Sequence, residues 1–561
     1  MKIGKVDNQS AQSRPGLSWI AALVLLAAFA GAVRTLATVG GGPDWAMIGH
    51  DSTNSRNQPH EHSIGPANAS QLVLKWTATT AGDVSATPAV VDGAVYFGDF
   101  GGMLWKLDAA TGHVIWSHQV PDYTGHAGDY ARTSPSLAGN TLVVGVIRGP
   151  NPQGLAFPNM LGIDASTGAL LWSAQIHPDF HAAMTGSPVL VGDTIITGIS
   201  ANGAGGANAT FRGAIVALNA QTGRILWRTY SLPDNGGVPG GYAGATMFSP
   251  PAVDLQAGLV YGTFGQAYTE PASVTACHAD HRANDAGHPV FTESCEQPGS
   301  YLKSVVAFDL KTGEPKWSYR VQGHGPWVRA CGSQPSTVTW CAAESDGEKW
   351  DIGGSGVNVM RLRMNGHWRD VVGLGAKSGV YTLLDANTGE FIWNTLIGPG
   401  GDQGGMEWGT AFDGNRIYAS ITNQHHISYK LTENGVISNT SVTGGSWAAL
   451  DPISGTILWQ TPDPQVETLS GLGVVGVWDL APVTVANGVV YASSMARLAT
   501  QNQMFALDAA TGTILWQFSA GSSVNSGPAV VDGTVYWGSG YSRSAEGSGN
   551  HLLFAFSTGG Q

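Results

Sequence analysis

The sequence predicts an all-β protein, an eight-bladed β-propeller of four-stranded antiparallel blades that is closed by strands from both ends of the chain. Three observations predict this fold. A ten-residue phrase that ends in Trp recurs seven times, a second strand–turn–strand element recurs between the copies, and incomplete pieces of the phrase stand at the two ends. No apolar stripe of helical period persists, which argues against a helical solenoid.

Each copy of the repeated phrase predicts a β-hairpin. An apolar residue ends one strand, Asp or Asn opens the turn through its side-chain oxygen, Gly supplies a positive φ, and the second strand runs into Trp. We expect each Trp to cover a neighbouring hairpin, so that the phrase joins blades and carries no chemistry. The copies are LDAATGHVIW (107–116), IDASTGALLW (163–172), LNAQTGRILW (218–227), FDLKTGEPKW (308–317), LDANTGEFIW (384–393), LDPISGTILW (450–459) and LDAATGTILW (507–516).

The segments between the copies supply two more strands for each blade, as in SATPAVVDGAVYFGDFGG (85–102) and SGPAVVDGTVYWGSG (526–540). At the ends of the chain, LLFAFSTGG (552–560) begins the phrase without its Trp, and LVLKW (72–76) supplies a Trp strand without a turn before it. Joined in space, these two pieces complete an eighth blade. A ring closed in this way has no open sheet edges.

Composition and the N-terminus suggest a secreted protein. The formal net charge is -13 and there is no basic run, which argues against nucleic acid or an anionic membrane surface as a partner. Residues 1–40 are expected to be a signal peptide or an N-terminal membrane anchor, because the apolar run 17–33 follows three cationic residues; both alternatives remain open. Residues 41–561 form the propeller, which we expect to be periplasmic or otherwise outside the cytoplasm, with residues 17–33 as its one contact with a membrane.

The four cysteines are even in number, which in an exported chain indicates disulfides. Of the three possible pairings, that of nearest partners joins Cys277 with Cys295 and Cys331 with Cys341. The chain has no C-x-x-C-H sequence, so it does not carry a c-type haem of its own.

A propeller places the first strand of every blade around its axis, so the residues that lead into these strands line a central channel. Several of them are polar or charged, which predicts a ligand site, although a water-filled channel also accounts for them. They include Ala86-Thr87, Arg132-Thr133, Thr185-Gly186, Phe248-Ser249, 356–358, Glu407-Trp408, Asp479 and Asn525.

Most of residues 44–561 resembles the quinoprotein alcohol dehydrogenases that hold pyrroloquinoline quinone (PQQ), and among them the polyvinyl alcohol dehydrogenase-like group. The stretches that carry the resemblance are DWAMIGHDSTNSRNQ (44–58), TFRGAIVALNAQTGRILW (210–227), WDIGGSGVNVM (350–360), GAKSGVYTLLDANTGE (375–390) and GGMEWGTAFDGNRIYAS (404–420). The resemblance implies an exported enzyme that oxidises an alcohol, polymeric alcohols included, with PQQ. It also implies Ca²⁺ beside the quinone, and a separate electron acceptor such as a cytochrome c or a membrane quinone.

The same resemblance assigns roles to individual residues. Lys377 is expected at the quinone oxygens, Thr185 at a hydrogen bond to the cofactor, and Arg132 facing the channel. Trp408 and Asp479, at inward strand starts, are further expected cofactor contacts. For the base that takes the proton of the alcohol, the candidates are Asp351 and Glu407.

The sequence departs from the family at four positions. Asn208 stands where relatives have a cysteine pair or a glutamate, Gln266 where they have an asparagine metal ligand, and Phe248 near the place of the tryptophan beneath the quinone. From these places, all three are expected to contact the cofactor. The catalytic aspartate expected in QPGSYLKSVVAFD (297–309) is missing. Fewer carboxylates weaken a Ca²⁺ site, so no metal ligand is assigned.

Two other functions remain open. The altered positions favour a cofactor-free propeller that serves as a protein-binding or envelope-assembly scaffold. A carbohydrate-binding propeller that uses Trp327 and Trp340 has no specific motif behind it. The long loop 267–303 is expected to return a lost carboxylate to the site or to form a lid braced by a disulfide.

Overall fold

The computed structural model describes residues 41–149, 159–206, 208–284, 293–321, 351–543 and 547–559. The apolar run 17–33, the cysteines Cys331 and Cys341, and the tryptophans Trp327 and Trp340 lie outside the described residues. Within these ranges no helix has the length and apolar character needed to cross a bilayer.

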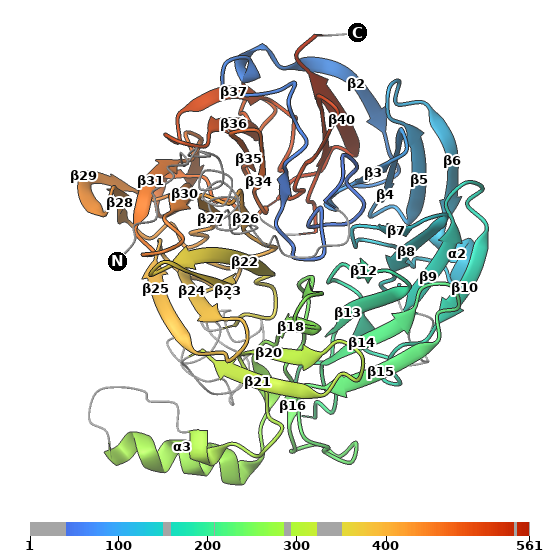
Figure 1. Cartoon of the computed structure of the whole chain (residues 1–561), viewed down its shortest axis with the longest axis vertical. Helices are drawn as coiled ribbons and strands as arrows, with labels where there is room; N and C mark the ends of the chain where they lie inside the picture. The colour runs from blue at the N-terminus through green and yellow to red at the C-terminus, as the bar shows by residue number, and fades with distance from the viewer. Residues whose placement is uncertain are drawn as a thin grey trace, which may run out of the picture. The chain divides into compact units, whose positions relative to one another are not determined.

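In the described residues, eight four-stranded antiparallel sheets follow one another around a ring (Figure 1), which confirms the predicted propeller. The strands of the first four blades are β3 (Ala89–Val91), β4 (Ala94–Gly98), β5 (Met103–Asp108) and β6 (Val114–Gln119); β7 (Ser136–Ala138), β8 (Thr141–Gly145), β9 (Met160–Asp164) and β10 (Leu170–Ala174); β12 (Val189–Val191), β13 (Thr194–Ala201), β14 (Ala214–Asn219) and β15 (Ile225–Tyr230); and β17 (Ala252–Asp254), β18 (Leu259–Thr263), β20 (Ser304–Asp309) and β21 (Pro315–Arg320).

The other four blades have the same order from the inside outward. Their strands are β22 (Val357–Met364), β23 (His367–Gly375), β24 (Val380–Asp385) and β25 (Phe391–Leu396); β26 (Ala411–Phe412), β27 (Ile417–Ile421), β30 (Ser446–Leu450) and β31 (Ile457–Pro462); β34 (Thr484–Ala486), β35 (Val489–Ser493), β36 (Met504–Asp508) and β37 (Ile514–Phe518); and β38 (Ala529–Val531), β39 (Thr534–Ser539), β40 (Leu552–Ser557) and β2 (Val73–Thr79).

The remaining elements decorate the ring. The short strands are β1 (Asn57–Gln58), which pairs with β34, β11 (Ala182–Ala183), which pairs with β13, and the hairpins β16 (Ala243–Gly244) with β19 (Ala267–Thr269), β28 (Tyr429–Glu433) with β29 (Val436–Val442), and β32 (Val466–Leu469) with β33 (Gly473–Gly476). The helices are η1 (Ala69–Gln71), α2 (Val120–Thr124), α3 (Ala272–Asn284) and η2 (Glu293–Cys295).

The ring is closed by strands from both ends of the described chain, as the sequence predicts. Strand β2 pairs antiparallel with β40, from Val73 opposite Ser557 to Thr79 opposite Leu552. Figure 1 shows the two strands side by side, blue against red. Strand β2 thus covers the outward edge of β40, which would otherwise be unpaired at the junction of the termini.

A recurring tryptophan joins every blade to the next one. The indole N–H donates a hydrogen bond to a backbone carbonyl in or beside the repeated turn of the following blade, and the eight bonds form a closed cycle. The donor and acceptor pairs are Trp76 to Ala109, Trp116 to Ala165, Trp172 to Ala220, Trp227 to Leu310, Trp317 to Ala386, Trp393 to Pro452, Trp459 to Ala509 and Trp516 to Leu72, at 2.8 to 3.2 Å.

The glycine of the repeated turn is required twice. Gly512 has φ +72°, a conformation that disfavours any side chain, and a Cβ there would lie 2.5 Å from the Trp459 ring. The turn is closed by Asp508, whose Oδ1 accepts the backbone N–H of Thr511 at 2.9 Å. The repeated turn therefore requires glycine both for its own backbone conformation and for its contact with the tryptophan ring of the neighbouring blade.

The segment Trp45–Gln58, part of the family-like stretch 44–58, crosses the channel at the depth of the inner strands. Its backbone or side chains are hydrogen-bonded to the inner strands of seven blades, for example Ser52 O to Val253 N at 2.6 Å and Thr53 O to Val359 N at 3.0 Å. Arg56 is fully buried and donates to Val483 O at 2.9 Å. This stretch is therefore structural, because it fills the channel below the starts of the inner strands.

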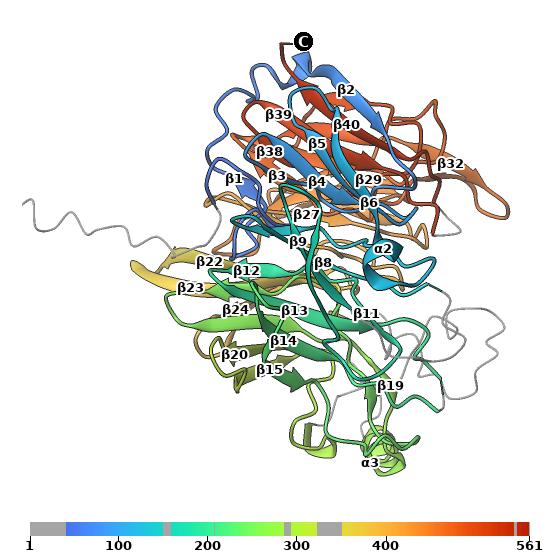
Figure 2. The same ribbon diagram turned by 90° about the vertical axis from the view of Figure 1, so that its right-hand side faces the viewer.

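The long loop leaves the ring between β18 and β20. It holds α3, which lies outside the stacked blades in Figure 2, and the predicted bond between Cys277 and Cys295 is present. Within the loop Glu296 is held by three side chains, since Tyr242 and Ser300 donate to its Oε2 at 2.9 and 2.7 Å and His278 lies 3.1 Å from its Oε1.

The contact between turn and tryptophan can be tested with two glycines of equal φ. Gly93, also at φ +72°, has open space where a Cβ would be. We expect Gly93→Ala to lower the free energy of unfolding by about 1–2 kcal/mol, the cost of an alanine at positive φ. Gly512→Ala is expected to cost about 1–3 kcal/mol more, because the methyl group also meets the Trp459 ring. Urea unfolding followed by circular dichroism measures both; equal losses would show that the ring contact contributes nothing.

Candidate active site

A cavity of 260 Å³ lies at one end of the channel, across the third to sixth blades. It is built from segments that precede the inner strands β17, β22 and β26 and from segments that follow the neighbouring strands β13, β18 and β23. These positions share one end of the ring because adjacent strands are antiparallel. The side chains that line it are those of Ser200, Thr246, Phe248, Gln266, Tyr268, Asp351, Lys377, Asp402, Gln403, Glu407 and Trp408. We call this cavity the channel pocket.

A buried lysine between two carboxylates is the main electrostatic feature of the channel pocket. Lys377 Nζ lies 3.3 Å from Glu407 Oε1 and 3.6 Å from Asp351 Oδ2. It also donates a hydrogen bond to Asp402 O at 2.8 Å. All three charged side chains are buried, so their interactions are screened much less than those of surface ion pairs.

The two carboxylates have different surroundings. Burial, the largest influence, raises the pKa of the Glu407 carboxyl to about 7; the Lys377 charge opposes this rise and the Asp351 charge adds to it. Asp351 Oδ1 instead accepts the backbone N–H of Gly353 at 2.9 Å. Glu407 can therefore gain or lose a proton near neutral pH, while Asp351 is fixed by its loop.

Two aromatic rings form walls of the channel pocket. Phe248 and Trp408 meet edge to face with centroids 6.0 Å apart, and Lys377 Nζ lies 5.7 Å from the Phe248 centroid. Trp408 adopts φ 64°, a conformation uncommon for a large residue, and its Nε1 is buried with no hydrogen-bond partner in the part of the chain that the structure describes. A strained backbone and an unsatisfied donor at the same residue are typical of a ligand site.

Glycines bring the loop 398–405 against the lysine. A Cβ on Gly400 would lie 2.5 Å from Lys377 O, and one on Gly405 would lie 2.3 Å from Gly379 N. Only glycine permits this approach, which places Asp402 and Glu407 on either side of the Lys377 ammonium.

Most residues that the sequence singled out meet at the channel pocket. Phe248, Gln266, Asp351, Lys377, Glu407 and Trp408 all line it. Arg132 lies just outside, with its guanidinium carbon 5.2 Å from the Trp408 ring centroid. Thr185 does not line it either, but its neighbour Gly186 lies against Ser249, and Thr185 Oγ1 is buried with no hydrogen-bond partner among the described residues.

Two expected cofactor residues lie elsewhere. Asn208 is exposed and does not line the channel pocket, because its loop turns outward before β14. Asp479 is fully buried beside Asp463 rather than at the pocket, and both burial and the Asp463 carboxyl raise its pKa well above the ordinary value. Both carboxyl groups lie in the fold interior, away from the channel pocket.

Sequence reasoning missed five residues that line the channel pocket: Ser200, Thr246, Tyr268, Asp402 and Gln403. Asp402 and Gln403 stand in the glycine-rich run GPGGDQGG (398–405), immediately before the family-like stretch that contains Glu407. That density of glycine was the available signal. Ser200 ends a strand whose exact length the sequence does not reveal.

The channel pocket carries few groups that could bind a metal ion. Across the described residues, no three His, Cys, Asp or Glu side chains are grouped to hold an ion. In the pocket the two carboxylates face the Lys377 ammonium instead. Because Ca²⁺ requires about six to eight oxygen ligands, this donor set does not fit a Ca²⁺ site.

Comparisons with known proteins agree with the fold. The family model described as "Outer membrane protein assembly factor BamB" (PQQ_2) matches residues 76–319, 212–445 and 443–556. A polyvinylalcohol dehydrogenase of Pseudomonas sp. is 28% identical over 92% of this chain and 78% of the relative. A quinohemoprotein alcohol dehydrogenase of Comamonas testosteroni is 25% identical over 92% of this chain and 77% of the relative.

The crystal structure of a quinohemoprotein alcohol dehydrogenase from Comamonas testosteroni has the same fold, with a TM-score of 0.66 at 21% identity over 92% of this chain and 81% of that chain. The family model covers most of the propeller, and the relatives align along nearly its whole length. The chain therefore belongs to the PQQ_2 family of propellers, and its relatives group it with the quinoprotein alcohol dehydrogenases, in the polyvinyl alcohol dehydrogenase-like group.

Proposed function

We propose that this protein is an alcohol dehydrogenase that holds PQQ in the channel pocket and oxidises a hydroxyl group there. The names of its relatives support an oxidoreductase that acts on alcohols. The observation that carries the proposal is Lys377, buried between Asp351 and Glu407 in a cavity walled by Phe248 and Trp408. A cation, a titrating carboxylate and aromatic surfaces are what oxidation of an alcohol by a flat quinone requires.

The residues present fit PQQ. The rings of Phe248 and Trp408 offer apolar contact to a flat molecule, and Lys377 Nζ offers a positive charge to quinone oxygens. Trp408 Nε1 and Thr185 Oγ1 are buried polar atoms without partners among the described residues, so a polar ligand would satisfy them. PQQ, when bound, accepts the two electrons of the oxidation.

The protein's own contribution is to move a proton and to orient the alcohol. Glu407 is the proposed base, because a pKa of about 7 leaves it able to accept the hydroxyl proton at neutral pH. Asp351, tied to Gly353 N, holds the Lys377 ammonium in place. Burial of all three groups excludes water and strengthens the attraction between them.

We derive no step through Ca²⁺, since the pocket carboxylates are already compensated by Lys377. The electrons must leave the protein, and with no c-type haem sequence in the chain we propose a separate acceptor, such as a cytochrome c or a membrane quinone. The disulfide between Cys277 and Cys295 supports a location outside the cytoplasm, as the N-terminal run suggests.

The role of Lys377 can be tested by titrating apoprotein with PQQ and following the quinone absorbance. Lys377→Met is expected to weaken binding about tenfold to a hundredfold, because a charge-assisted contact to the quinone is lost in a buried site. Lys311→Met, at an exposed turn of the repeated hairpin, is the matched control and should bind as the unchanged protein does. A thermal melt of each variant checks that the fold persists.

If Lys377→Met and Lys311→Met bind PQQ with equal affinity, Lys377 does not contact the cofactor. If the unchanged protein binds no PQQ, the cofactor proposal fails as a whole. Crosslinking in an envelope extract would then distinguish the scaffold alternative, which requires a defined protein partner that Lys377→Met still retains.

The role of Glu407 predicts a pH dependence. Because its pKa is raised to about 7, the carboxylate that accepts the proton forms as the pH rises through that value. We expect kcat/KM for a simple alcohol to increase about tenfold per pH unit below pH 7 and to level off above it. Glu407→Gln should abolish this rise of kcat/KM with pH and lower kcat/KM by roughly a hundredfold or more. If the rise persists in Glu407→Gln, another group is the base.

A further inference from the structure

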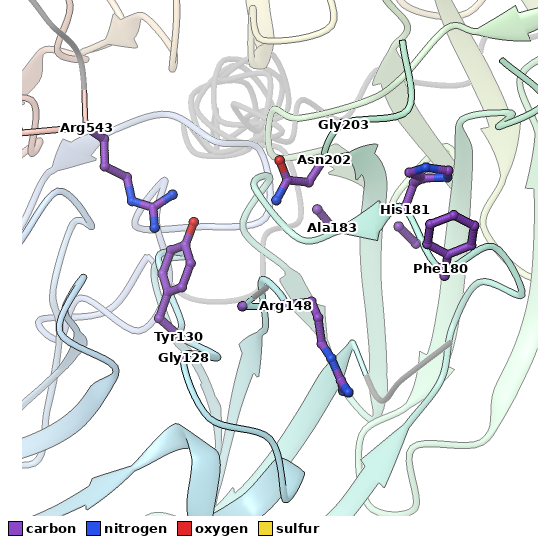
Figure 3. Close-up of a pocket in the computed structure, with 11 residues that line it drawn as sticks. Gly128, Tyr130, Arg148, Phe180, His181, Ala183, Asn202, Gly203 and Arg543 are labelled. Carbon is purple, nitrogen blue, oxygen red and sulfur yellow. The ribbon is translucent and has the colours of Figure 1, made fainter. Parts of the chain in front are cut away.

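A second cavity of 490 Å³ lies beside the channel pocket (Figure 3). It is formed by loops of the first three blades and by one arginine from the last blade. The polar side chains at its wall belong to Tyr130, Arg148, His181, Asn202 and Arg543. We call this cavity the arginine cavity.

The two cavities adjoin through one strand. Ser200, near the end of β13, lines the channel pocket, and Asn202, two residues further on, lines the arginine cavity. Strand β11 braces this end of β13, with Ala183 opposite Ser200. The loops that carry them open at the same end of the ring.

A run of cations and aromatic rings also joins the cavities. The Arg543 guanidinium lies 4.0 Å from the Tyr130 centroid, and Tyr130 meets Phe100 at 5.8 Å. Arg132 lies between Phe100 and Trp408, at 5.7 and 5.2 Å from their centroids. Because Trp408 is a wall of the channel pocket and Tyr130 and Arg543 are walls of the arginine cavity, this run of side chains extends from one cavity to the other.

The arginine cavity is positive on a chain whose net charge is -13. Arg543 stacks on Tyr130 and is paired with no carboxylate within the part of the chain that the structure describes. Two acids contact side chains of the wall. Asp129 is fully buried, and its Oδ1 already accepts Gly149 N at 2.8 Å and lies 2.9 Å from His126 Nδ1, while Asp179 Oδ1 lies 2.9 Å from His181 Nδ1. Arg148 lies 3.8 Å from the other oxygen of Asp129.

We propose that the arginine cavity binds a carboxylate on the substrate, while a hydroxyl group of the same molecule is oxidised in the channel pocket. The substrate class is then an extended hydroxy-carboxylate. A guanidinium held flat against an aromatic ring presents its N–H groups edgewise, in the arrangement that matches the two oxygens of a carboxylate. This inference rests on the proposed function for the hydroxyl end and on Arg543 for the carboxylate end.

The first experiment compares ω-hydroxyalkanoates with the diols of equal length, from the hexane to the dodecane chain, as substrates of the PQQ-loaded protein. Arg543→Gln is expected to lower the ratio of kcat/KM for hydroxyalkanoate over diol about tenfold, and Arg543→Lys to lower it less. Arg224→Gln removes an exposed arginine from a repeated turn at the outer rim and should leave the ratio unchanged. Added salt should reduce the ratio in the unchanged protein, because the attraction is screened.

The second experiment separates this inference from the proposed function. Decanedioate, which has no hydroxyl group to oxidise, is titrated into apoprotein by calorimetry, so neither PQQ nor turnover is needed. Binding that weakens about tenfold in Arg543→Gln and is unaffected in Arg224→Gln supports the carboxylate site even if the protein never oxidises an alcohol. No binding, or binding that Arg543→Gln leaves unchanged, overturns it.

Discussion

The bond from each tryptophan indole to the turn of the next blade is the interaction on which the rest of the structure depends. One such bond contributes little by itself, about 1 kcal/mol, but eight of them in a closed cycle fix the rotation of every blade on its neighbour. The starts of the inner strands then meet around one axis. Closure depends on Trp516 and Trp76, which attach the blade built from both ends of the chain. The site is therefore a product of the repeat, although no residue of the repeat belongs to it.

The ring of blades surrounds a channel. The part of the channel below the starts of the inner strands and the part above them contain different kinds of polar groups. Below the inner strand starts, Trp45–Gln58 satisfies backbone groups of seven blades with buried polar atoms, among them the guanidinium of Arg56, whose pKa burial lowers to about 9. Above it, Lys377, Asp351 and Glu407 are also buried but less completely compensated, because one lysine faces two carboxylates. The lower level rigidifies the ring. The upper level keeps the Glu407 carboxyl near its titration point, and shifted pKa values of this kind cluster at functional sites.

The sequence predicts features that depend on residues close together in the chain better than features that depend on residues far apart. The hairpins, the closure by both termini and the bond between Cys277 and Cys295 rest on local patterns, and all are present. The grouping of Lys377 with Glu407 depends on the ring geometry, and the family resemblance supplied it. The sequence could not show whether Asn208 and Asp479 line the channel pocket, because a strand start indicates a position near the axis but not the path of its loop; neither residue lines it. Arg543 was not singled out, since its contact with Tyr130 spans most of the chain.

Trp408 ties the channel pocket to the cavity beside it. The centroid of its ring lies 6.0 Å from the centroid of the Phe248 ring and 5.2 Å from the guanidinium carbon of Arg132. Its positive φ is followed by that of Gly409, at φ +120°, and the preceding residue, Glu407, is held by Lys377 at 3.3 Å. A ligand in the channel pocket contacts this strained residue directly, because Trp408 is one of the walls of that pocket. The arginine cavity is connected to Trp408 through Tyr130, Phe100 and Arg132, so the two ends of the proposed substrate would lie at opposite ends of one run of side chains.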